Sequence, residues 1–231
     1  MRIRIAFTRK QLLAMTAPTP TVEAIYYAQK RPEMLPFVPA TAKRVMELGC
    51  AEAAFAATVK ERTGAEVWGI EFNEQAAERA RGVIDRVLVG DADGQIAELP
   101  DGYFDAIVCN DVLEHLVEPG ATLRQLRQKL APGGVVVASI PNIRFLPALS
   151  QVVFRKDFPQ EDAGIFDRTH LRFFTRKSIV RLFETAGFTM RNMKGINAYR
   201  GPLGVLLTLV TFGYFSDVFY TQYACVASPS T

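Results

Sequence analysis

The stretch DVLEH holds three residues that could do acid–base or metal chemistry together. Asp111, Glu114 and His115 are spaced i, i+3 and i+4, so in a helical turn all three side chains would project from one face. His170, the second of only two histidines in the chain, follows in the stretch DRTHLRFF. An imidazole titrates near neutrality, which suits the removal of a proton from a hydroxyl group. The first hypothesis is therefore that one histidine, assisted by Glu114, is a general base.

Two other interpretations of these residues stay open. Mixed carboxylate and imidazole ligands suit Mg²⁺, Mn²⁺ or Zn²⁺, and a bound metal ion would lower the pKa of a hydroxyl group. The ligands would then be Asp111, Glu114, His115 and His170. In the third interpretation Glu114 and His115 only brace a helix and a loop. The residues alone do not choose between a base, a metal site and a structural brace.

An alternating series of elements must position these side chains. Apolar, β-rich runs predict strands at 44–48, 66–70, 85–89, 104–109, 134–140, 188–197 and 219–227. Helix-period segments lie among them at 52–62, 74–82, 119–130 and 176–186. Such alternation predicts βαβ units and a parallel sheet with helices on both faces. Ligands of such sheets bind at the carboxyl ends of the strands, where the strand order reverses.

The first of these strand ends is the stretch ELGCAEAAF. Gly49 is its only glycine, and Ala53 stands where a second glycine is expected. A helix that opens near Glu52 would offer free N–H groups to an anion. If Ala53 lies in helical backbone space, its methyl group costs little. If it needs a positive φ, the strain is about 1 kcal/mol or more.

Polar residues also end the next three strands. Glu71 is placed to accept both hydroxyls of a ribose, and Asp91 could accept a hydrogen bond from an adenine amino group. Asn110 and Asp111 end the fourth strand. Isolated acidic residues at strand ends are often only solvated. Their succession over four strand ends, at the intervals of a nucleotide-binding sheet, indicates a cofactor site.

These stretches resemble the class I S-adenosylmethionine-dependent methyltransferases from residue 21 to the end of the chain. The likeness extends to a bacterial group found beside glycosyltransferases of surface-glycan clusters, and to the ubiquinone-pathway O-methyltransferases. It implies a Rossmann-like α/β fold whose mostly parallel, seven-stranded sheet has an antiparallel last strand. The residues that carry it are ELGCAEAAF, VWGIEFNEQAAERA, LVGDAD, LPDGYFDAIVCNDVLEHL, LAPGGVVVASIPN and DRTHLRFFTRKSIVRLFETAGF.

The resemblance implies S-adenosylmethionine as cofactor and gives roles to single residues. Gly49 and its neighbours would line the methionine part, Glu71 would bind the ribose, and Asn110 would reach the methionine end. The pattern acid-x-x-Glu-His with a later His is also similar to the metal site of small-RNA 2′-O-methyltransferases. The full set assigned to the cofactor is Glu47, Gly49, Cys50, Ala51, Glu71, Phe72, Asp91, Ala92, Asn110 and Asp111.

The implied activity is methyl transfer to a small-molecule or glycan acceptor, with a hydroxyl as the expected target. Alternatives are a small-molecule N-methyltransferase, an RNA 2′-O-methyltransferase and an inactive, methyltransferase-like binding or scaffold protein, which Ala53 keeps open. A net charge of +3 without a dense Lys/Arg stripe argues against a nucleic-acid partner.

The remaining features concern organisation. We expect residues 1–40 to form an extension with a helix at 21–35 that caps the cofactor site, and residues 41–231 to form the methyltransferase domain. Cys50, Cys109 and Cys225 form no CxxC pair, which favours a reducing, cytoplasmic compartment. The apolar segment 203–215 is shorter than the ~20 residues of a spanning helix. We expect it to be a helix packed against the sheet, with contact to a lipid carrier or a membrane surface as the alternative.

Overall fold

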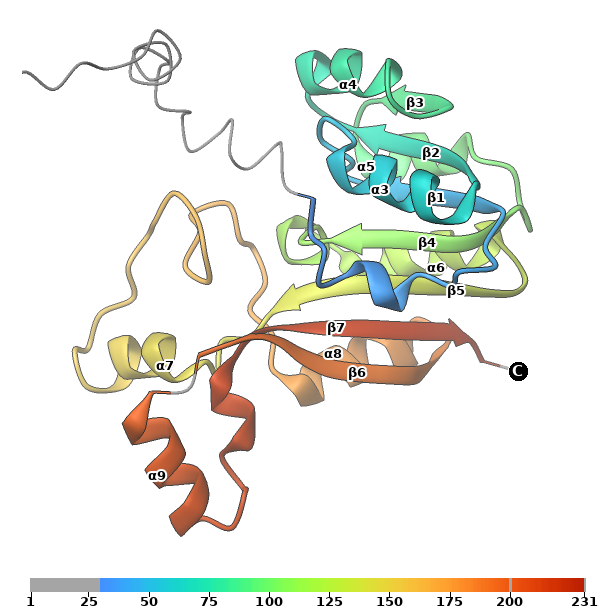
Figure 1. Ribbon diagram of the computed structural model, residues 1–231. Helices are drawn as coiled ribbons and strands as arrows, with labels where there is room; N and C mark the ends of the chain where they lie inside the picture. Colours follow the sequence, from blue (N-terminus) through green and yellow to red (C-terminus); the bar gives the residue numbers. More distant parts are fainter. Residues whose placement is uncertain (1–29, 200, 231) are drawn as a thin grey trace, which may run out of the picture.

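The computed structural model describes residues 30–199 and 201–230 and contains one seven-stranded sheet (Figure 1). The strand order is β3-β2-β1-β4-β5-β7-β6, and β7 runs antiparallel to both of its neighbours. This confirms the expected topology. The strands are β1 (Arg44–Leu48), β2 (Glu66–Glu71), β3 (Arg86–Val89), β4 (Phe104–Asn110), β5 (Leu130–Pro141), β6 (Phe188–Ala198) and β7 (Tyr220–Pro229).

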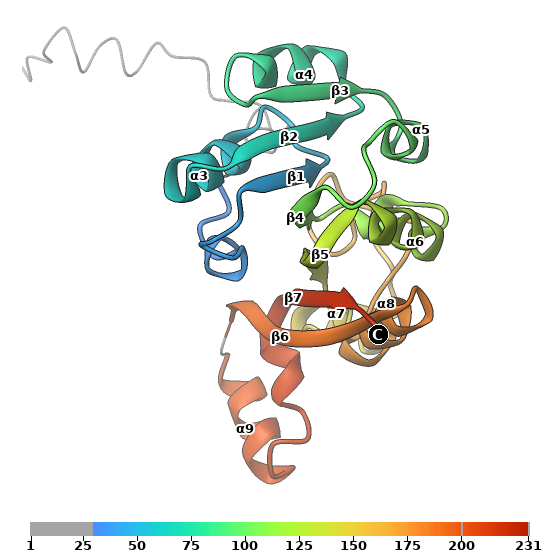
Figure 2. The ribbon, with the colours of Figure 1, turned by 90° about the vertical axis from the view of Figure 1, so that its right-hand side faces the viewer.

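Helices cover both faces of the sheet (Figure 2). Four of them agree with the sequence prediction to within two residues at either end. The short helices α5 and α7 were not predicted, because each is short and contains a residue that disfavours helices, Gly94 in α5 and Pro147 in α7. The helices are α3 (Ala54–Thr63), α4 (Glu74–Arg81), α5 (Ala92–Ala97), α6 (Pro119–Lys129), α7 (Leu146–Val153), α8 (Arg176–Thr185) and α9 (Pro202–Val210), with single turns η1 (Leu35–Phe37), η2 (Leu113–His115) and η3 (Ser216–Phe219).

Alternating side chains of the central strands divide between two cores. Met46 and Leu48 of β1 face α5, α6 and α8, whereas Val45 faces α3 and η1. Apolar residues on both sides of one strand are what a doubly covered parallel sheet requires. The strand order reverses between β1 and β4, which pair in parallel with Leu48 opposite Cys109. The ends of β1, β2 and β4 therefore meet at one edge of the sheet.

The N-terminal extension is described only in part, since residues 1–29 lie outside the described residues. The expected helix at 21–35 falls mostly there. From residue 30 onward the backbone forms turns and η1. Met34 and Val38 are buried in the same core as Ala224 of β7. The described part of the extension thus covers the face of the sheet beside β5 and β7.

The expectation that segment 203–215 packs against the sheet is wrong. Helix α9 is part of the connection between β6 and β7, and it projects away from the sheet in both views (Figures 1 and 2). Leu209 is 69% exposed and Phe212 is 99% exposed. The physical reason is that α5, α6 and α8 already pack on one face of the sheet, and α3 and η1 on the other. No helix in the described ranges is long and apolar enough to cross a membrane.

Candidate functional site

The loop after β1 is built around a glycine that no other residue could replace without adjustment. Gly49 has a φ of +69°, and a Cβ at this position would lie 2.7 Å from Cγ2 of Val112. The N–H groups of Gly49 and Cys50 both donate to the carbonyl of Ile70, at 2.8 and 3.1 Å. The loop is thus hydrogen-bonded to β2, and its backbone at Gly49 lies close to Val112, which follows β4.

The two alanines of the loop also have left-handed backbone. Ala51 has a φ of 51°, and Ala53, the N-cap of α3, has a φ of 62°. This decides between the alternatives for Ala53 in favour of strain, at about 1 kcal/mol for a non-glycine residue. Helix α3 begins at Ala54, two residues later than expected, and Ala53 offers it no side-chain cap.

Glu71, at the end of β2, connects the loops that follow β1 and β2. Its Oε2 accepts the N–H of Ala51, and its Oε1 accepts the N–H of Asn73, both at 2.8 Å. The carboxylate is buried at the cleft wall, and each oxygen retains a second lone pair. Two backbone donors fix its orientation, so it can accept a pair of neighbouring hydroxyls without rearrangement.

Glu47 and Asn110 form a buried pair beneath the loop. Asn110 donates from Nδ2 to Oε1 of Glu47 at 3.2 Å. Burial raises the pKa of Glu47 to about 8, against the opposing effect of that hydrogen bond. Within the described chain, Oε2 of Glu47 and Oδ1 of Asn110 have no hydrogen-bond partner. A buried acceptor without a partner is costly, so this pair suits a donor supplied from outside the chain.

The residues at these strand ends line a cleft of about 1160 Å³. Seven of the ten residues predicted to bind the cofactor lie in its wall: Gly49, Ala51, Glu71, Phe72, Asp91, Ala92 and Asp111. Glu47, Cys50 and Asn110 do not line it. Glu47 and Asn110 lie beneath the loop, and the Cys50 side chain packs into the core beside α3.

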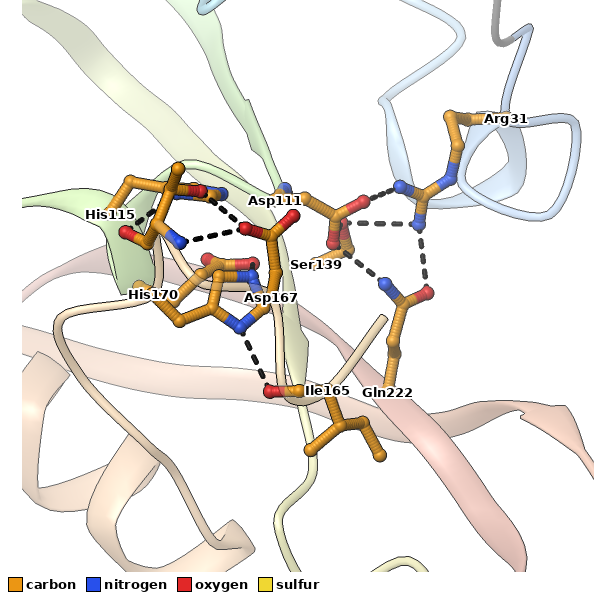
Figure 3. A network of polar contacts seen from close by, with 10 residues as sticks. Arg31, Asp111, His115, Ser139, Ile165, Asp167, His170 and Gln222 are labelled. Carbon is orange, nitrogen blue, oxygen red and sulfur yellow. Dashed lines mark hydrogen bonds and ion pairs between the residues drawn. The ribbon is translucent and has the colours of Figure 1, made fainter. Parts of the chain in front are cut away.

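Asp111 is held by residues from distant parts of the chain (Figure 3). Its carboxylate accepts hydrogen bonds from Arg31, from Ser139 Oγ at 3.0 Å and from Gln222 Nε2 at 2.8 Å. Its φ of 52° turns the side chain toward this network. The expected helical face shared by Asp111, Glu114 and His115 is therefore not formed, because η2 begins only at Leu113.

A second cavity of about 680 Å³ adjoins the cleft. The walls of the two spaces share Asp111, His115, Ala163 and Asp167, whereas His170 lines the second cavity only. Asp167 belongs to the loop between α7 and α8 that carries His170. A molecule in one space can therefore meet a molecule in the other at the end of β4.

The two histidines are oriented by backbone carbonyl groups (Figure 3). His170 Nδ1 lies 3.0 Å from the carbonyl of Ile165, and His115 Nδ1 lies 3.2 Å from that of Thr169. A carbonyl only accepts, so each neutral ring carries its proton on Nδ1 and has a free lone pair on Nε2. Burial lowers the pKa of His115, and the neighbouring His170 lowers it further.

Glu114 is a buried carboxyl group beside these rings. Both of its oxygens lack a hydrogen-bond partner in the described part of the chain, and Oε1 lies 4.0 Å from Nε2 of His170. Burial raises the pKa of Glu114 to about 8. Its backbone carbonyl accepts the N–H groups of Leu171 and Arg172, at 2.9 and 3.0 Å. These bonds hold the loop that carries His170 against η2.

The structure brings together three of the four candidate metal ligands. Donor atoms of Glu114, His115 and His170 all lie within 4.8 Å of one another. Asp111 is not part of this cluster, because its carboxylate is bound by Arg31 instead. Free Nε2 atoms with carbonyl-bound Nδ1–H groups are the arrangement of metal-binding histidines. The cluster thus combines one buried carboxyl group with two imidazole rings.

The sequence did not reveal several residues of this region. Ser139 and Asp167 lie within the stretches LAPGGVVVASIPN and DRTHLRFF but were given no role, whereas Arg31 and Gln222 belong to no motif. Arg31 lies in the extension, and Gln222 is a polar residue at the start of an apolar strand. Burial opposes ionisation of Asp167, but hydrogen bonds from the Thr169 side chain and backbone hold its pKa below the ordinary value.

A model described as a methyltransferase domain matches residues 23–192, well over half of the chain. The chain belongs to this methyltransferase family. It is 27% identical over 161 residues to a ubiquinone biosynthesis O-methyltransferase of Aeromonas salmonicida, covering 67% of this chain and 66% of that protein. It is 31% identical over 164 residues to the enzyme of that name from Neisseria meningitidis serogroup A, covering 67% of each.

Solved structures agree on the fold of this methyltransferase domain. A SAM-dependent methyltransferase from Archaeoglobus fulgidus matches with a TM-score of 0.62 at 19% identity, covering 89% of this chain and 93% of that one. The [4+2]-cyclase SpnF matches with a TM-score of 0.57 at 17% identity, covering 86% and 80%. Likeness at this identity shows the fold alone.

The family implies S-adenosylmethionine as cofactor, and the cleft fits it. The left-handed loop brings backbone close to the cleft, Glu71 offers two oriented acceptor oxygens, and Phe72 exposes an aromatic ring. The partnerless acceptors of Glu47 and Asn110 lie below the same loop. These features match the ribose, the adenine and the ammonium group of the cofactor in chemical kind.

Proposed function

We propose that the chain transfers a methyl group from S-adenosylmethionine to a hydroxyl group of a small-molecule or glycan acceptor. The observation that carries this proposal is the junction of two cavities at Asp111, His115 and Asp167. One cavity is lined by the residues that suit the cofactor, and the other contains His170. Methyl transfer needs this arrangement, because donor and acceptor must meet in line.

The cofactor supplies, when bound, an electrophilic methyl group on a sulfonium. Glu71 would hold the ribose hydroxyls, Phe72 would contact the adenine ring, and Asp91 with Ala92 would border it. Asn110 and Glu47 would accept from the ammonium group. The backbone of the loop from Gly49 to Ala53 would set the depth at which the methionine part lies. These residues position the methyl group at the junction, and none of them changes its own bonds.

His170 would act on the acceptor. Its Nε2 lone pair takes the hydroxyl proton as the new O–CH₃ bond forms and the S–CH₃ bond breaks. The carbonyl of Ile165 keeps the ring in the required tautomer, since it accepts the Nδ1–H. Glu114 Oε1 lies 4.0 Å from this ring, and an imidazolium there would favour the ionised form of the buried carboxyl group. His115, at the junction, would contact both molecules.

A metal-assisted form of the same reaction is the second candidate, favoured by the cluster of donor atoms. Glu114, His115 and His170 would then hold a divalent cation, which lowers the pKa of the acceptor hydroxyl. His170 would be a ligand instead of a base. Chelation distinguishes the two forms, because only the second loses activity with EDTA.

The choice of a hydroxyl rests on the names of the relatives and on the free imidazole lone pairs. A neutral amine attacks without a base, so an N-methyltransferase would tolerate loss of His170. An RNA substrate would require a basic surface along the second cavity. Its wall has two arginines, Arg31 and Arg155, against five acidic residues, which are Glu33, Asp111, Glu114, Glu161 and Asp167. A cytoplasmic location stays a prediction of the cysteine content.

The first experiment is calorimetric titration of the purified chain with S-adenosylhomocysteine, before and after EDTA treatment. We expect micromolar affinity in both conditions, because the cleft does not depend on the metal cluster. Absence of binding in either condition would overturn the proposal and leave the binding or scaffold protein as the leading alternative. With binding established, catechol, glycan and amine acceptors are compared for methyl transfer.

A further inference from the structure

An uncharged segment connects β6 to β7 and projects from the domain. Residues 201–216, here named the apolar hairpin, contain no Asp, Glu, Lys or Arg. They form α9 and the turn that follows it. Water-exposed apolar groups on one small projection are unusual for a monomer and indicate a surface that something else covers. The exposed side chains are Val205, Leu206, Leu209, Val210, Phe212 and Tyr214.

The shape of the apolar hairpin limits what can cover it. Phe212 and Gly213 both have positive φ and form its turn, and the Phe212 side chain is 99% exposed. The hairpin extends beyond the rest of the domain in both views (Figures 1 and 2). A protein partner would need a matching cavity to bury such a convex tip. A fluid lipid layer surrounds a convex tip without one.

The base of the apolar hairpin is fixed to the domain. Arg144 forms an ion pair with Asp217, with Nε 2.5 Å from Oδ2, and its guanidinium lies 5.6 Å from the centre of the Phe215 ring. Asn142 donates to the carbonyl of Asp217 at 2.9 Å. These contacts define the direction of the hairpin relative to the sheet, so it can orient the whole domain on a surface.

Two exposed cations follow the far end of the helix that lies beside the hairpin. Helix α7 lies beside the base in both views, and Phe145 at its start packs 6.4 Å from the ring of Tyr199. At its other end Phe154 is 75% exposed and is followed by the exposed cations Arg155 and Lys156. Exposed apolar groups next to cations are typical of surfaces that meet anionic lipid headgroups.

We propose that the apolar hairpin inserts into the surface of an anionic lipid bilayer. Helix α9 has nine residues and is roughly 14 Å long, which exceeds the ~5–10 Å to which interfacial helices are buried. Leu209 and Phe212 enter the apolar layer, and Tyr214 lies at the headgroup level, where aromatic hydroxyls are favoured. Arg155 and Lys156 contact the anionic headgroups.

The same geometry points to the class of acceptor, a step that rests on the proposed function. Phe145 and Arg155 of the α7 region line the second cavity together with Asn197 and Thr221, which lie near the two ends of the β6–β7 connection. The cavity is therefore bordered by the elements that would face the bilayer. An acceptor anchored in lipid by an apolar chain can present its hydroxyl-bearing head there without leaving the membrane.

The test is flotation of the full chain with vesicles of phosphatidylcholine and phosphatidylglycerol in equal parts. We expect the wild-type chain to float with them and the variant Leu209→Gln/Phe212→Ser to lose at least about tenfold in partitioning, since two apolar anchors are removed. Val83→Gln is the matched control, because Val83 is exposed beyond α4 at the opposite edge of the sheet. Pure phosphatidylcholine vesicles separate the contribution of the cations.

Two outcomes overturn the proposal. One is a wild-type chain that does not bind these vesicles. The other is that the wild-type chain is a dimer in sedimentation equilibrium, that the double variant is a monomer, and that both bind vesicles equally. A second copy of the chain would then be what covers the hairpin. Affinity for S-adenosylhomocysteine is measured on every variant. A wild-type chain that does not bind S-adenosylhomocysteine would refute the proposed function. A wild-type chain that binds S-adenosylhomocysteine but not the vesicles refutes only the membrane proposal.

Discussion

The cofactor cleft and the second cavity are built in different ways. In the cleft, backbone groups of three short loops meet at the ends of adjacent parallel strands, and Glu71 binds two of these loops together. In the second cavity, side chains come from the extension, η2, the α7–α8 loop and β7. The sheet topology forms the first site, whereas long-range side-chain contacts form the second.

This difference indicates how each site responds to mutation. A side chain removed from the second cavity should impair chemistry and leave the cofactor in place. A change in the loop after β1 should impair cofactor binding and leave the acceptor side intact. His170, which lines only the second cavity, and Glu71, which lines only the cleft, allow each half to be disrupted separately.

The largest expected effect is that of His170→Ala. Loss of a general base lowers turnover of a hydroxyl acceptor by about 100-fold or more. The affinity for S-adenosylhomocysteine should stay within about twofold, because His170 does not line the cleft. Steady-state methyl transfer and calorimetry measure the two quantities. Leu171→Ala, at the exposed neighbouring position, is the control, and full turnover by His170→Ala would return that residue to a structural role.

Much of the cleft could be predicted from the sequence because its geometry follows from strand order. Once the strands at 44–48, 66–70 and 104–109 are recognised, Gly49, Glu71 and Asn110 must lie at one edge. The backbone conformation was not predictable in the same way. That Ala51 and Ala53 have positive φ depends on how the loop is tied to Ile70 and Glu71.

Less of the second cavity could be predicted, since its contacts span large sequence separations. Arg31 and Asp111 are 80 residues apart, and Gln222 and Asp111 are 111 apart. No local pattern reveals such pairs. The helical spacing of Asp111 and Glu114 even suggested a shared face, which the left-handed backbone of Asp111 prevents. The direction of α9 was missed for a similar reason, because which elements cover each face of the sheet depends on long-range packing.

Glu71→Ala should affect only the cleft. Hydrogen bonds to a carboxylate contribute about 1.5–3 kcal/mol, so the affinity for S-adenosylhomocysteine should fall by about tenfold to 100-fold. Calorimetry measures the affinity and thermal unfolding confirms that the chain remains folded. Glu78→Ala, at an exposed position of α4, is the matched control. Unchanged affinity would show that Glu71 does not bind the ribose. The cleft and the second cavity could then not be told apart by this pair of variants.

Glu47→Gln tests the buried carboxyl group beneath the cleft. Because the folded-state pKa of Glu47 is raised from 4.5 to about 8, the folded protein holds a proton that the unfolded chain releases between these values. The stability of the wild-type chain therefore falls as pH rises through this window. The variant should lack this contribution, which is at most about 1.4 kcal/mol per pH unit. Urea unfolding at pH 5, 6, 7 and 8 measures it, and parallel curves for the two proteins would show that Glu47 is ionised in the folded state.

The smallest expected effect concerns the backbone of the cofactor loop. Ala51→Gly relieves about 1 kcal/mol of left-handed strain but gives the unfolded chain more freedom, which leaves a net gain of about 0.5 kcal/mol. The melting temperature should rise by about 1–2 °C. Ala57→Gly within α3 is the opposite control and should lose about 1 kcal/mol, because its backbone is helical. If both variants were destabilised equally, the loop would tolerate alanine without strain. A gain confined to Ala51→Gly would show that the cofactor loop stores strain in its backbone, whereas the second cavity depends on its side chains.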